Sequence, residues 1–309
     1  MANSTMVTEI LLLGSPDGWN MRVLYFTVFT VNYLGTLLGN LLIVTVTTAD
    51  QNLHTPMYFF LRNLSILDMC FISIIVPNAC VNSLTGNRVI SVGGCATQIF
   101  LVIFCACVEL LFLTIMAWDF YVAICQPIIM KLQFCPCHPH DPVFPAQWSG
   151  VCRCAHWETF QLSFYQSNVV HQFFCDVPSL LRLSCSDTRN NIILLLLSFI
   201  IVGGGCFGLI IMLYIHLLST VLKSPTRASV KAFSTCTPHI LVVSVFLSSS
   251  TGVYLRPSPT SDTLQDRVLS AFYTMVPPLV NPLIYSLRNK QVMEAMGTVM
   301  GVQFFLRKC

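Results

Sequence analysis

Long uncharged runs of apolar residues dominate the hydrophobic pattern of this chain. A helix needs about 20 such residues to cross the ~30 Å hydrocarbon layer of a bilayer. The pattern predicts six membrane-spanning helices, at Val23–Thr48, Asn63–Leu84, Ala96–Trp118, Asn191–Leu222, Ala232–Leu255 and Val268–Leu287. A polar turn is expected at Asp50–Arg62, and Gln291–Met300 is expected to lie along the membrane as a short amphipathic helix. The pattern therefore predicts an all-α membrane protein.

Composition agrees with this interpretation and narrows the possible partners. The chain has 309 residues, of which 55% are hydrophobic and 9% are charged, and its mean hydropathy is +0.72. Soluble domains carry roughly 25% charged residues. The net charge of +3 comes from thinly spread Lys and Arg, which argues against nucleic acid as a partner. Six cysteines lie within apolar runs, where we expect free thiols that pack as small hydrophobic groups: Cys70, Cys80, Cys105, Cys107, Cys206 and Cys236.

Three polar residues lie deep inside predicted spans. Asn40 is in the first span, Asp68 is the only charged residue of the second, and Glu109 is the only charged residue of the third. Because lipid offers no hydrogen bonds, each side chain needs a partner within the bundle. The two carboxyl groups have two interpretations, which are structural acids bonded to neighbouring helices or a cation site.

The segment Lys131–Tyr165 does not fit the helical pattern. It contains four prolines within ten residues, together with several charges and histidines. Interior proline costs a helix about 3 kcal/mol, so no window of about 18 residues can cross the membrane. Basic residues nevertheless place the 223–231 link and the C-terminal tail in the cytoplasm, and counting spans from both ends requires one crossing between Cys125 and Cys175. The residues alone do not resolve this conflict.

The same segment holds a cluster of metal-binding residue types, which are Cys135, Cys137, His138, His140, Cys152, Cys154 and His156. Zinc is one interpretation, but C-x-C pairs differ from the usual C-x₂₋₄-C spacing. Chance clustering in a proline-rich segment is the interpretation we favour, and we predict no cofactor. Catalytic motifs such as HExxH, a Walker A loop or GxSxG do not occur, so an enzyme is not predicted.

Five motifs give the chain a family resemblance: LHTPMYFFLRNLS (Leu53–Ser65), MAWDFYVAIC (Met116–Cys125), SNVVHQFFCD (Ser167–Asp176), KAFSTC (Lys231–Cys236) and PPLVNPLIYSLRNK (Pro277–Lys290). Over about residues 1–130 and 166–305, the chain resembles olfactory receptors, a family of rhodopsin-like G-protein-coupled receptors. The resemblance implies one seven-transmembrane domain over 1–309, with an extracellular N-terminus at 1–22 and a cytoplasmic tail at 288–309. It stops at the 131–165 segment, which has nearly the family's length. A shifted and then restored reading frame is therefore a hypothesis that the coding DNA would test.

The resemblance also implies particular sites. Cys95 and Cys175 match the family's disulfide, and Asn3 begins an Asn-Ser-Thr glycosylation sequon. Asp68, Glu109 and Asn281 match the residues that hold a sodium ion in rhodopsin-like receptors. Odorant-pocket candidates come from the third and sixth spans, where ordinary helix packing is the alternative interpretation: Ile103, Ala106, Cys107, Leu247, Ser250, Thr251 and Tyr254.

The implied function is that of an odorant receptor in the plasma membrane. It would bind a small volatile ligand inside the bundle and signal through a stimulatory heterotrimeric G protein to cAMP. The implied switch residues are Asp119, Phe120, Asn281, Pro282 and Tyr285. Phe120 replaces the signature arginine, which anchors the inactive state and contacts the G protein, so we predict weak or absent agonist-dependent signalling. Alternatives are a non-signalling protein retained in the endoplasmic reticulum and a small-molecule transporter, although the chain lacks the internal repeats that a transporter would need.

Overall fold

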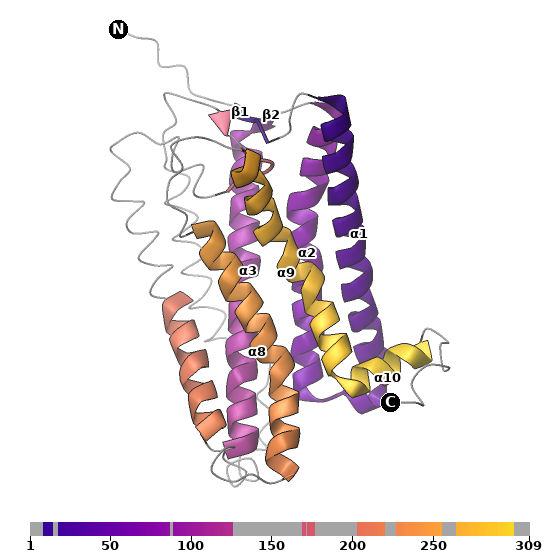
Figure 1. Cartoon of the computed structure of the whole chain (residues 1–309), viewed down its shortest axis with the longest axis vertical. Coiled ribbons are helices and arrows are strands. Elements are labelled where there is room, and N and C mark those ends of the chain that lie inside the picture. The colour runs from indigo at the N-terminus through magenta and orange to yellow at the C-terminus, as the bar shows by residue number, and fades with distance from the viewer. Residues whose placement is uncertain are drawn as a thin grey trace.

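The computed structural model describes residues 9–14, 18–86, 89–125, 169–170, 172–176, 203–219, 227–254 and 264–299. Long helices run side by side, with three short strands at one end of the bundle and α10 lying across the other (Figure 1). We call these the strand end and the α10 end. The labelled helices are α1 (Trp19–Ala49), α2 (Pro56–Thr85), α3 (Val92–Cys125), α8 (Arg227–Tyr254), α9 (Leu264–Arg288) and α10 (Lys290–Val299).

The described helices have the length and surface of membrane spans. Four of them are long and apolar enough to cross a bilayer, at Trp19–Ala49, Pro56–Thr85, Val92–Val122 and Arg267–Leu287. Gly203–Ser219 and Cys236–Ser250 are shorter apolar helices. One face of α1 exposes apolar side chains three or four residues apart, namely Leu24, Val28, Val31, Leu34, Leu38 and Leu41. Such a stripe is stable against lipid and costly against water, so this is a multi-pass membrane protein.

Helix boundaries differ from the predicted ones where polar residues extend a helix beyond its apolar core. The turn predicted over Asp50–Arg62 is wrong beyond Thr55, because a short 3-10 turn (Gln51–Leu53) leads into α2 at Pro56. Proline suits the first helical position, where its missing N–H would have no partner. The third helix continues to Cys125 rather than Trp118, and α8 begins at Arg227 rather than Ala232.

Several predictions fall outside the described residues. These are the 131–165 segment with its possible zinc ligands, the Asn3 sequon, and the parts of the Asn191–Leu222 span that flank Gly203–Ser219. The described part of that span is helical, as predicted.

Two glycines bring α1 against α9. A Cβ atom on Gly35 would lie 3.3 Å from Cδ1 of Leu279, and one on Gly39 would lie 3.0 Å from Cγ of Pro282. Glycines four residues apart share a helix face and allow two membrane helices to approach closely. The predicted internal partner of Asn40 is found at this contact, because its buried side-chain amide donates to the Pro278 carbonyl at 2.9 Å and to the Thr36 carbonyl at 3.0 Å.

A small sheet closes the strand end. It consists of β1 (Glu9–Leu12), β2 (Val89–Ser91) and β3 (Val169–Val170) in the order β2-β1-β3, with β1 antiparallel to β2 and parallel to β3. The Leu13 amide extends the pairing by donating to the Val170 carbonyl at 2.7 Å. Ile10 and Leu12 are buried and pack with the disulfide and α3 in one apolar cluster. The sequence pattern did not reveal this sheet.

Arginine side chains fasten the strand end from two sides. Arg22 donates to the Ser83 carbonyl at 3.0 Å and to the Leu84 carbonyl at 2.5 Å, which satisfies the free carbonyls at the end of α2. Gly86 ends α2 with a φ of 71°, and a Cβ atom there would lie 2.7 Å from the Arg22 guanidinium. Arg267 of α9 donates to the Leu13 carbonyl at 2.8 Å, so the N-terminal segment is held to the last long helix.

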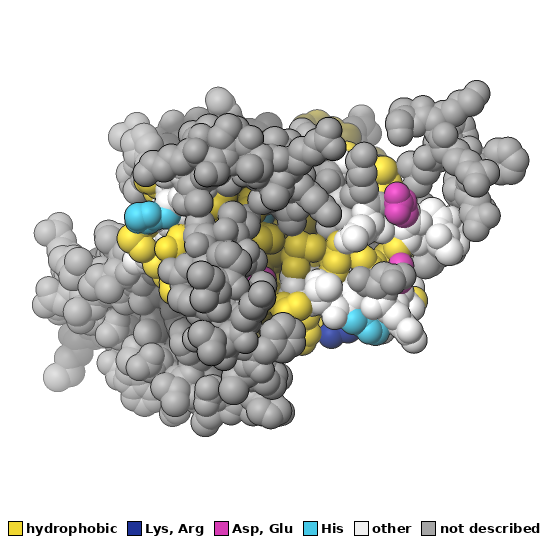
Figure 2. All heavy atoms as spheres, turned by 90° about the horizontal axis from the view of Figure 1, so that it is seen from below, with side chains coloured by type: hydrophobic (Ala, Val, Ile, Leu, Met, Phe, Trp, Pro, Cys, Tyr) yellow, Lys and Arg dark blue, Asp and Glu magenta, His cyan; other side chains and the backbone are white. Residues whose placement is uncertain are grey.

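The α10 end is organised around a tyrosine of the LHTPMYFFLRNLS motif. The buried Tyr58 hydroxyl donates to Oε1 of Gln291 at 2.6 Å and accepts from the Asn289 amide at 3.2 Å, which joins α2 to the α9–α10 junction. Val292, Ala295 and Met296 of α10 pack into the main core while the opposite face is exposed, which confirms the predicted amphipathic helix. Seen from this end, the described side chains form a largely hydrophobic band with few charged groups (Figure 2).

Candidate functional site

A cavity of about 120 Å³ lies within the bundle toward the strand end. Helices α2, α3, α8 and α9 form its walls, and residues 174–176 contribute at its outer side. Its apolar lining consists of Phe71, Ile75, Ile99, Val102, Ile103, Ala106, Phe174, Cys175, Phe246, Pro277 and Pro278. Its polar lining consists of Glu109, Asp176, Ser249, Ser250, Ser270, Tyr273 and Thr274. Apolar walls with a few polar groups are typical of sites for small organic ligands.

The structure brings some of the predicted pocket residues to this cavity. Ile103, Ala106 and Ser250 line it. Cys107 packs instead against the apolar cluster beneath the sheet, and Leu247 packs against the main core. The predicted residues whose side chains lie outside the described part of the chain are Thr251 and Tyr254.

The second and seventh spans supply lining residues that sequence reasoning missed. Phe71 and Ile75 lie one turn apart on α2, and Tyr273, Thr274 and Pro277 come from α9. Their spacing places each set on one helix face. A single helix pattern gives such a face but not its direction in the bundle, so only the packing of the other helices identifies these residues as cavity walls.

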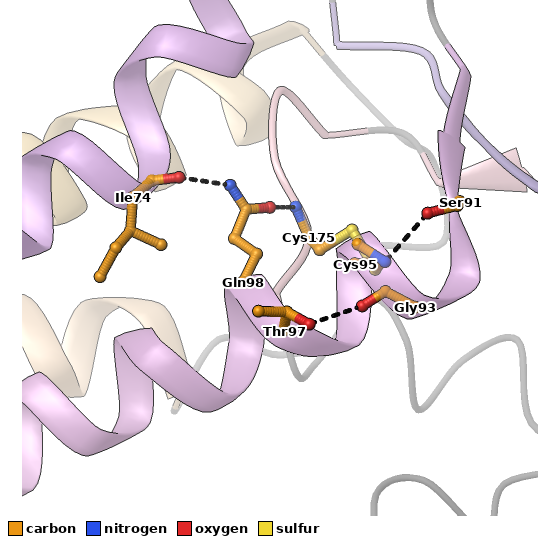
Figure 3. Close-up of a disulfide and its surroundings, with 8 residues drawn as sticks. Ile74, Ser91, Gly93, Cys95, Thr97, Gln98 and Cys175 are labelled. Carbon is orange, nitrogen blue, oxygen red and sulfur yellow. Dashed lines mark hydrogen bonds between the residues drawn. A yellow bond between two sulfur atoms is a disulfide. The ribbon is translucent and has the colours of Figure 1, made fainter.

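The disulfide and a buried glutamine fix the outer side of the cavity (Figure 3). Cys95 at the start of α3 is bonded to Cys175. Gln98, one turn further along α3, accepts a hydrogen bond from the Cys175 amide at 3.0 Å and donates to the Ile74 carbonyl of α2 at 3.0 Å. The glutamine therefore joins α2, α3 and the segment that carries Phe174 and Asp176. Its position within an apolar run was the only available signal for this role.

Two carboxyl groups lie deep in the bundle beside Asn281 of α9. The Asn281 amide donates to both carboxylate oxygens of Asp68, at 3.0 and 3.3 Å. It also lies within reach of the Glu109 carboxylate. Among the described residues, neither Oε1 of Glu109 nor Oδ1 of Asn281 has a hydrogen-bond partner, although both atoms are buried. The sequence-predicted trio is therefore a cluster of oxygen atoms with unused acceptor capacity.

The position of the signature arginine holds an apolar contact. Phe120 is 8% exposed, and its ring meets the buried His239 ring edge-on with centroids 5.7 Å apart. His239 of α8 in turn shares a 2.6 Å hydrogen bond through Nδ1 with the Tyr214 hydroxyl of the Gly203–Ser219 helix. Three helices thus meet through Phe120, His239 and Tyr214, a group that we call the aromatic lock.

The remaining switch residues lie on α3 and α9. Asp119 is partly buried, and Phe120 offers it no guanidinium for an ion pair. Pro282 contacts Gly39 of α1, as described above. Tyr285 is buried, and its hydroxyl has no hydrogen-bond partner among the described residues. Within those residues no group of three or more His, Cys, Asp and Glu side chains is placed to hold a metal ion.

Comparison with known proteins bears on the family and the fold of the chain. The olfactory receptor family model matches residues 29–302. Human olfactory receptor 14C36 is 54% identical over 312 aligned residues that cover 99% of each chain. Human olfactory receptor 14A16 is 46% identical, with 96% of this chain and 97% of that one covered.

The fold is that of rhodopsin. The crystal structure of squid rhodopsin matches 91% of this chain and 86% of its own, with a TM-score of 0.66 and 17% sequence identity. The described helices are thus part of a seven-transmembrane bundle. Taken with the family match, this means that the chain belongs to the olfactory receptor family and is a G-protein-coupled receptor rather than an enzyme.

Proposed function

We propose that this receptor binds a small volatile odorant in the cavity between α2, α3, α8 and α9. The observation that supports this most strongly is the cavity itself, which combines apolar walls with a few hydroxyl and carboxyl groups. A cavity of about 150 Å³ in another protein admits benzene, so 120 Å³ suits a ligand with a handful of heavy atoms. Three of the predicted residues line the cavity, and we propose that their side chains contact the odorant: Ile103, Ala106 and Ser250.

The strand end is proposed to face the extracellular side and the α10 end the cytoplasm. A disulfide at the strand end fits an oxidising compartment, because cytosolic thiols are kept reduced. The partner at the α10 end would be a stimulatory heterotrimeric G protein that raises cAMP, and the location would be the plasma membrane. Residues 1–22 would then be extracellular, and 288–309 would form the cytoplasmic tail.

Signalling is proposed to be impaired because of the aromatic lock. The motif that contacts the G protein in the family has an arginine where this chain has Phe120, whose ring has no hydrogen-bond donor and is buried against His239. Opening this end of the bundle would separate two aromatic contacts and expose apolar surface without any new charged contact to offset the cost. The closed arrangement is therefore favoured with or without ligand.

Asp68, Glu109 and Asn281 are proposed as the residues that would hold a sodium ion. The fit rests on two buried oxygen atoms that have no hydrogen-bond partner in the described part of the chain, Oε1 of Glu109 and Oδ1 of Asn281, beside the Asp68 carboxylate. Hard cations prefer such oxygen ligands, and a bound sodium ion would offset part of the negative charge of the two buried carboxyl groups. When bound, the ion would supply positive charge that stabilises this arrangement of α2, α3 and α9.

A cAMP reporter assay combined with surface labelling tests the proposal. The unaltered chain should give weak or no odorant response, even in cells where it reaches the surface. Replacing Phe120→Arg, together with an apolar fourth span in place of residues 131–165, should restore both surface delivery and signalling. Strong odorant responses from the unaltered chain would contradict the proposed impairment.

Retention in the endoplasmic reticulum is the competing proposal. It is favoured by the composition of residues 131–165, which conflicts with the membrane crossing required between Cys125 and Cys175. Maturation of the glycan at Asn3 distinguishes the two. Complex, endoglycosidase H-resistant glycans indicate transport through the Golgi apparatus, whereas exclusively high-mannose glycans indicate retention. An Asn3→Gln variant, which lacks the acceptor, is the control that assigns the glycan to this position.

A further inference from the structure

We propose that the ligand class preferred by this cavity is a small organic cation, such as a protonated alkylamine, whose ammonium group is held by Glu109. This inference rests on the proposed odorant-binding function and specifies its substrate class. The observation behind it is an acidic group that borders the cavity, is nearly completely buried, and has an oxygen atom that none of the described residues engages.

Glu109 borders the cavity, whereas its two polar neighbours, Asp68 and Asn281, do not. It is 7% exposed and lines the cavity, with Oε1 buried and without a hydrogen-bond partner among the described residues. Asp68 and Asn281 are bonded to each other and are not among the residues that line the cavity. A ligand in the cavity therefore reaches the carboxylate of Glu109 without displacing the Asp68–Asn281 pair.

The charge of the lining selects the sign of the ligand. Glu109 and Asp176 are the charged residues that the described part of the chain contributes to the cavity, and both are acids. A buried carboxylate without a counter-charge is costly, and an ammonium group offsets that cost through a charge-assisted hydrogen bond. An anionic ligand would meet the like charge of Glu109, and a neutral ligand would gain no charge-assisted hydrogen bond from it.

The rest of the lining selects an organic cation over a bare inorganic one. Phe71, Ile75, Val102, Ile103 and Phe246 provide apolar walls, against which an alkyl group gains contact. An inorganic cation prefers several oxygen ligands around it and gains nothing from these apolar walls. The volume of about 120 Å³ limits the ligand to a small amine.

Binding to the full-length chain in phosphatidylcholine nanodiscs tests this inference with two probes of nearly the same shape. They are 3-methylbutylamine, which is protonated at pH 7 as a lysine side chain is, and the neutral 3-methylbutan-1-ol. The amine should bind about tenfold tighter or more, which is the advantage expected of a hydrogen bond between charged groups. This comparison uses the unaltered protein, so it does not depend on the folding of any variant.

Variants then assign the advantage to one carboxylate. Glu109→Gln should reduce the ratio of the two dissociation constants to within about twofold, because a neutral amide cannot pair with the ammonium charge. Glu109→Asp should keep a preference for the amine. The matched control is Glu294→Gln, which removes the same charge from an exposed position on α10 and should leave the ratio unchanged.

Three results would overturn the inference. If the alcohol binds as tightly as the amine, the charge preference is refuted while the odorant-binding function stands. If neither probe binds to folded protein, the inference fails, because a cavity that prefers small amines should bind this one. If sodium chloride, but not potassium chloride, stabilises the chain in a Glu109-dependent manner and the amine does not compete with it, the carboxylate serves an inorganic ion alone. Competition between the amine and sodium would support the inference.

Discussion

The two ends of the bundle are held together by different kinds of interaction. The strand end is tied by a disulfide, by the hydrogen bonds of Gln98, and by the arginines that bind the carbonyls of Leu84 and Leu13. The described part of the α10 end is held by apolar packing, by the aromatic lock and by the bonds of Tyr58. Directional polar bonds thus fix one end, while mainly non-directional packing closes the other.

In the proposed receptor, this difference would separate ligand binding from signalling. The strand end keeps the features that position a ligand cavity, whereas the α10 end carries the departure at Phe120. A receptor built in this way can retain a specific pocket while its response to occupancy is weakened. Changes at the strand end should therefore alter ligand binding, and changes at the α10 end should alter stability and coupling with little effect on the cavity.

Removal of the disulfide should have the largest effect. A Cys95→Ser/Cys175→Ser double variant frees a link that spans 80 residues, and the expected loss of stability is on the order of 4 kcal/mol. Thermal unfolding in nanodiscs measures this loss, and ligand affinity should fall with it. Cys70→Ser, at an exposed free cysteine, is the control and should change neither. Unchanged ligand affinity in the double variant would break the proposed link between this tether and the pocket.

Truncation of the aromatic lock should have the next largest effect. Phe120→Ala leaves a cavity beside His239, and buried Phe→Ala changes typically cost about 3–5 kcal/mol when the site cannot collapse. We expect about 3 kcal/mol at this helix junction, measured by thermal unfolding, with ligand affinity unchanged within about twofold. Phe104→Ala on the same helix is the control, since that ring is 42% exposed. A large loss of ligand affinity from Phe120→Ala would show that the two ends are not separable.

Gln98→Leu tests the polar tether without a large change in side-chain size. It leaves the Cys175 amide and the Ile74 carbonyl without their side-chain partner, at a cost of about 2 kcal/mol for buried groups. Affinity for the ligand should fall more than it does for Phe120→Ala, although the loss of stability is smaller. Thr97→Val is the neighbouring control, because its hydroxyl makes only an exposed bond within the same helix. Equal affinity losses in both variants would assign no special role to Gln98.

The smallest effect is expected from Tyr58→Phe at the α10 end. This change removes the hydroxyl that joins α2 to Gln291 and Asn289, and a net hydrogen bond contributes about 1 kcal/mol. Proteolysis at the α9–α10 junction should become faster while ligand affinity stays constant. Tyr33→Phe, whose hydroxyl makes an exposed contact with Ser73, should leave the cleavage rate unaltered. If the cleavage rates of the two variants match, Tyr58 does not hold α10.

Sequence patterns predicted most of the described helices but few of the contacts between them. Apolar runs located the spans, and the depth of Asn40 predicted an internal partner that proved to be the Pro278 carbonyl. Boundaries were missed where helices continue into polar sequence, as at Pro56. Hydropathy locates the part of a helix that lies in the hydrocarbon layer and not the residues at which the helix begins and ends. The family motifs were needed to propose the trio of Asp68, Glu109 and Asn281, which come from three different helices.

Contacts between distant segments could not be read from the sequence. The pocket walls on α2 and α9 depend on how each helix is rotated, which periodicity leaves undetermined. β1 is four residues long, and its pairing partners lie at Val89–Ser91 and Val169–Val170, so neither alternation nor turn chemistry marks it. Gln98 acts through backbone groups of Ile74 and Cys175, and backbone partners carry no sequence signal.

The position of β1 in the chain means that it is synthesised well before the two strands with which it pairs. Leu12 leaves the ribosome long before Val170, its partner in the sheet, which lies 158 residues further along the chain and follows after about 8–30 s at ~5–20 residues per second. The middle strand of the finished sheet is thus the first to be made; its partner on one edge, Val89–Ser91, follows earlier, and the other edge has no partner until Val170 has been made. An unpaired apolar strand edge is a template for wrong pairing, so the nascent chain is open to this error throughout the interval.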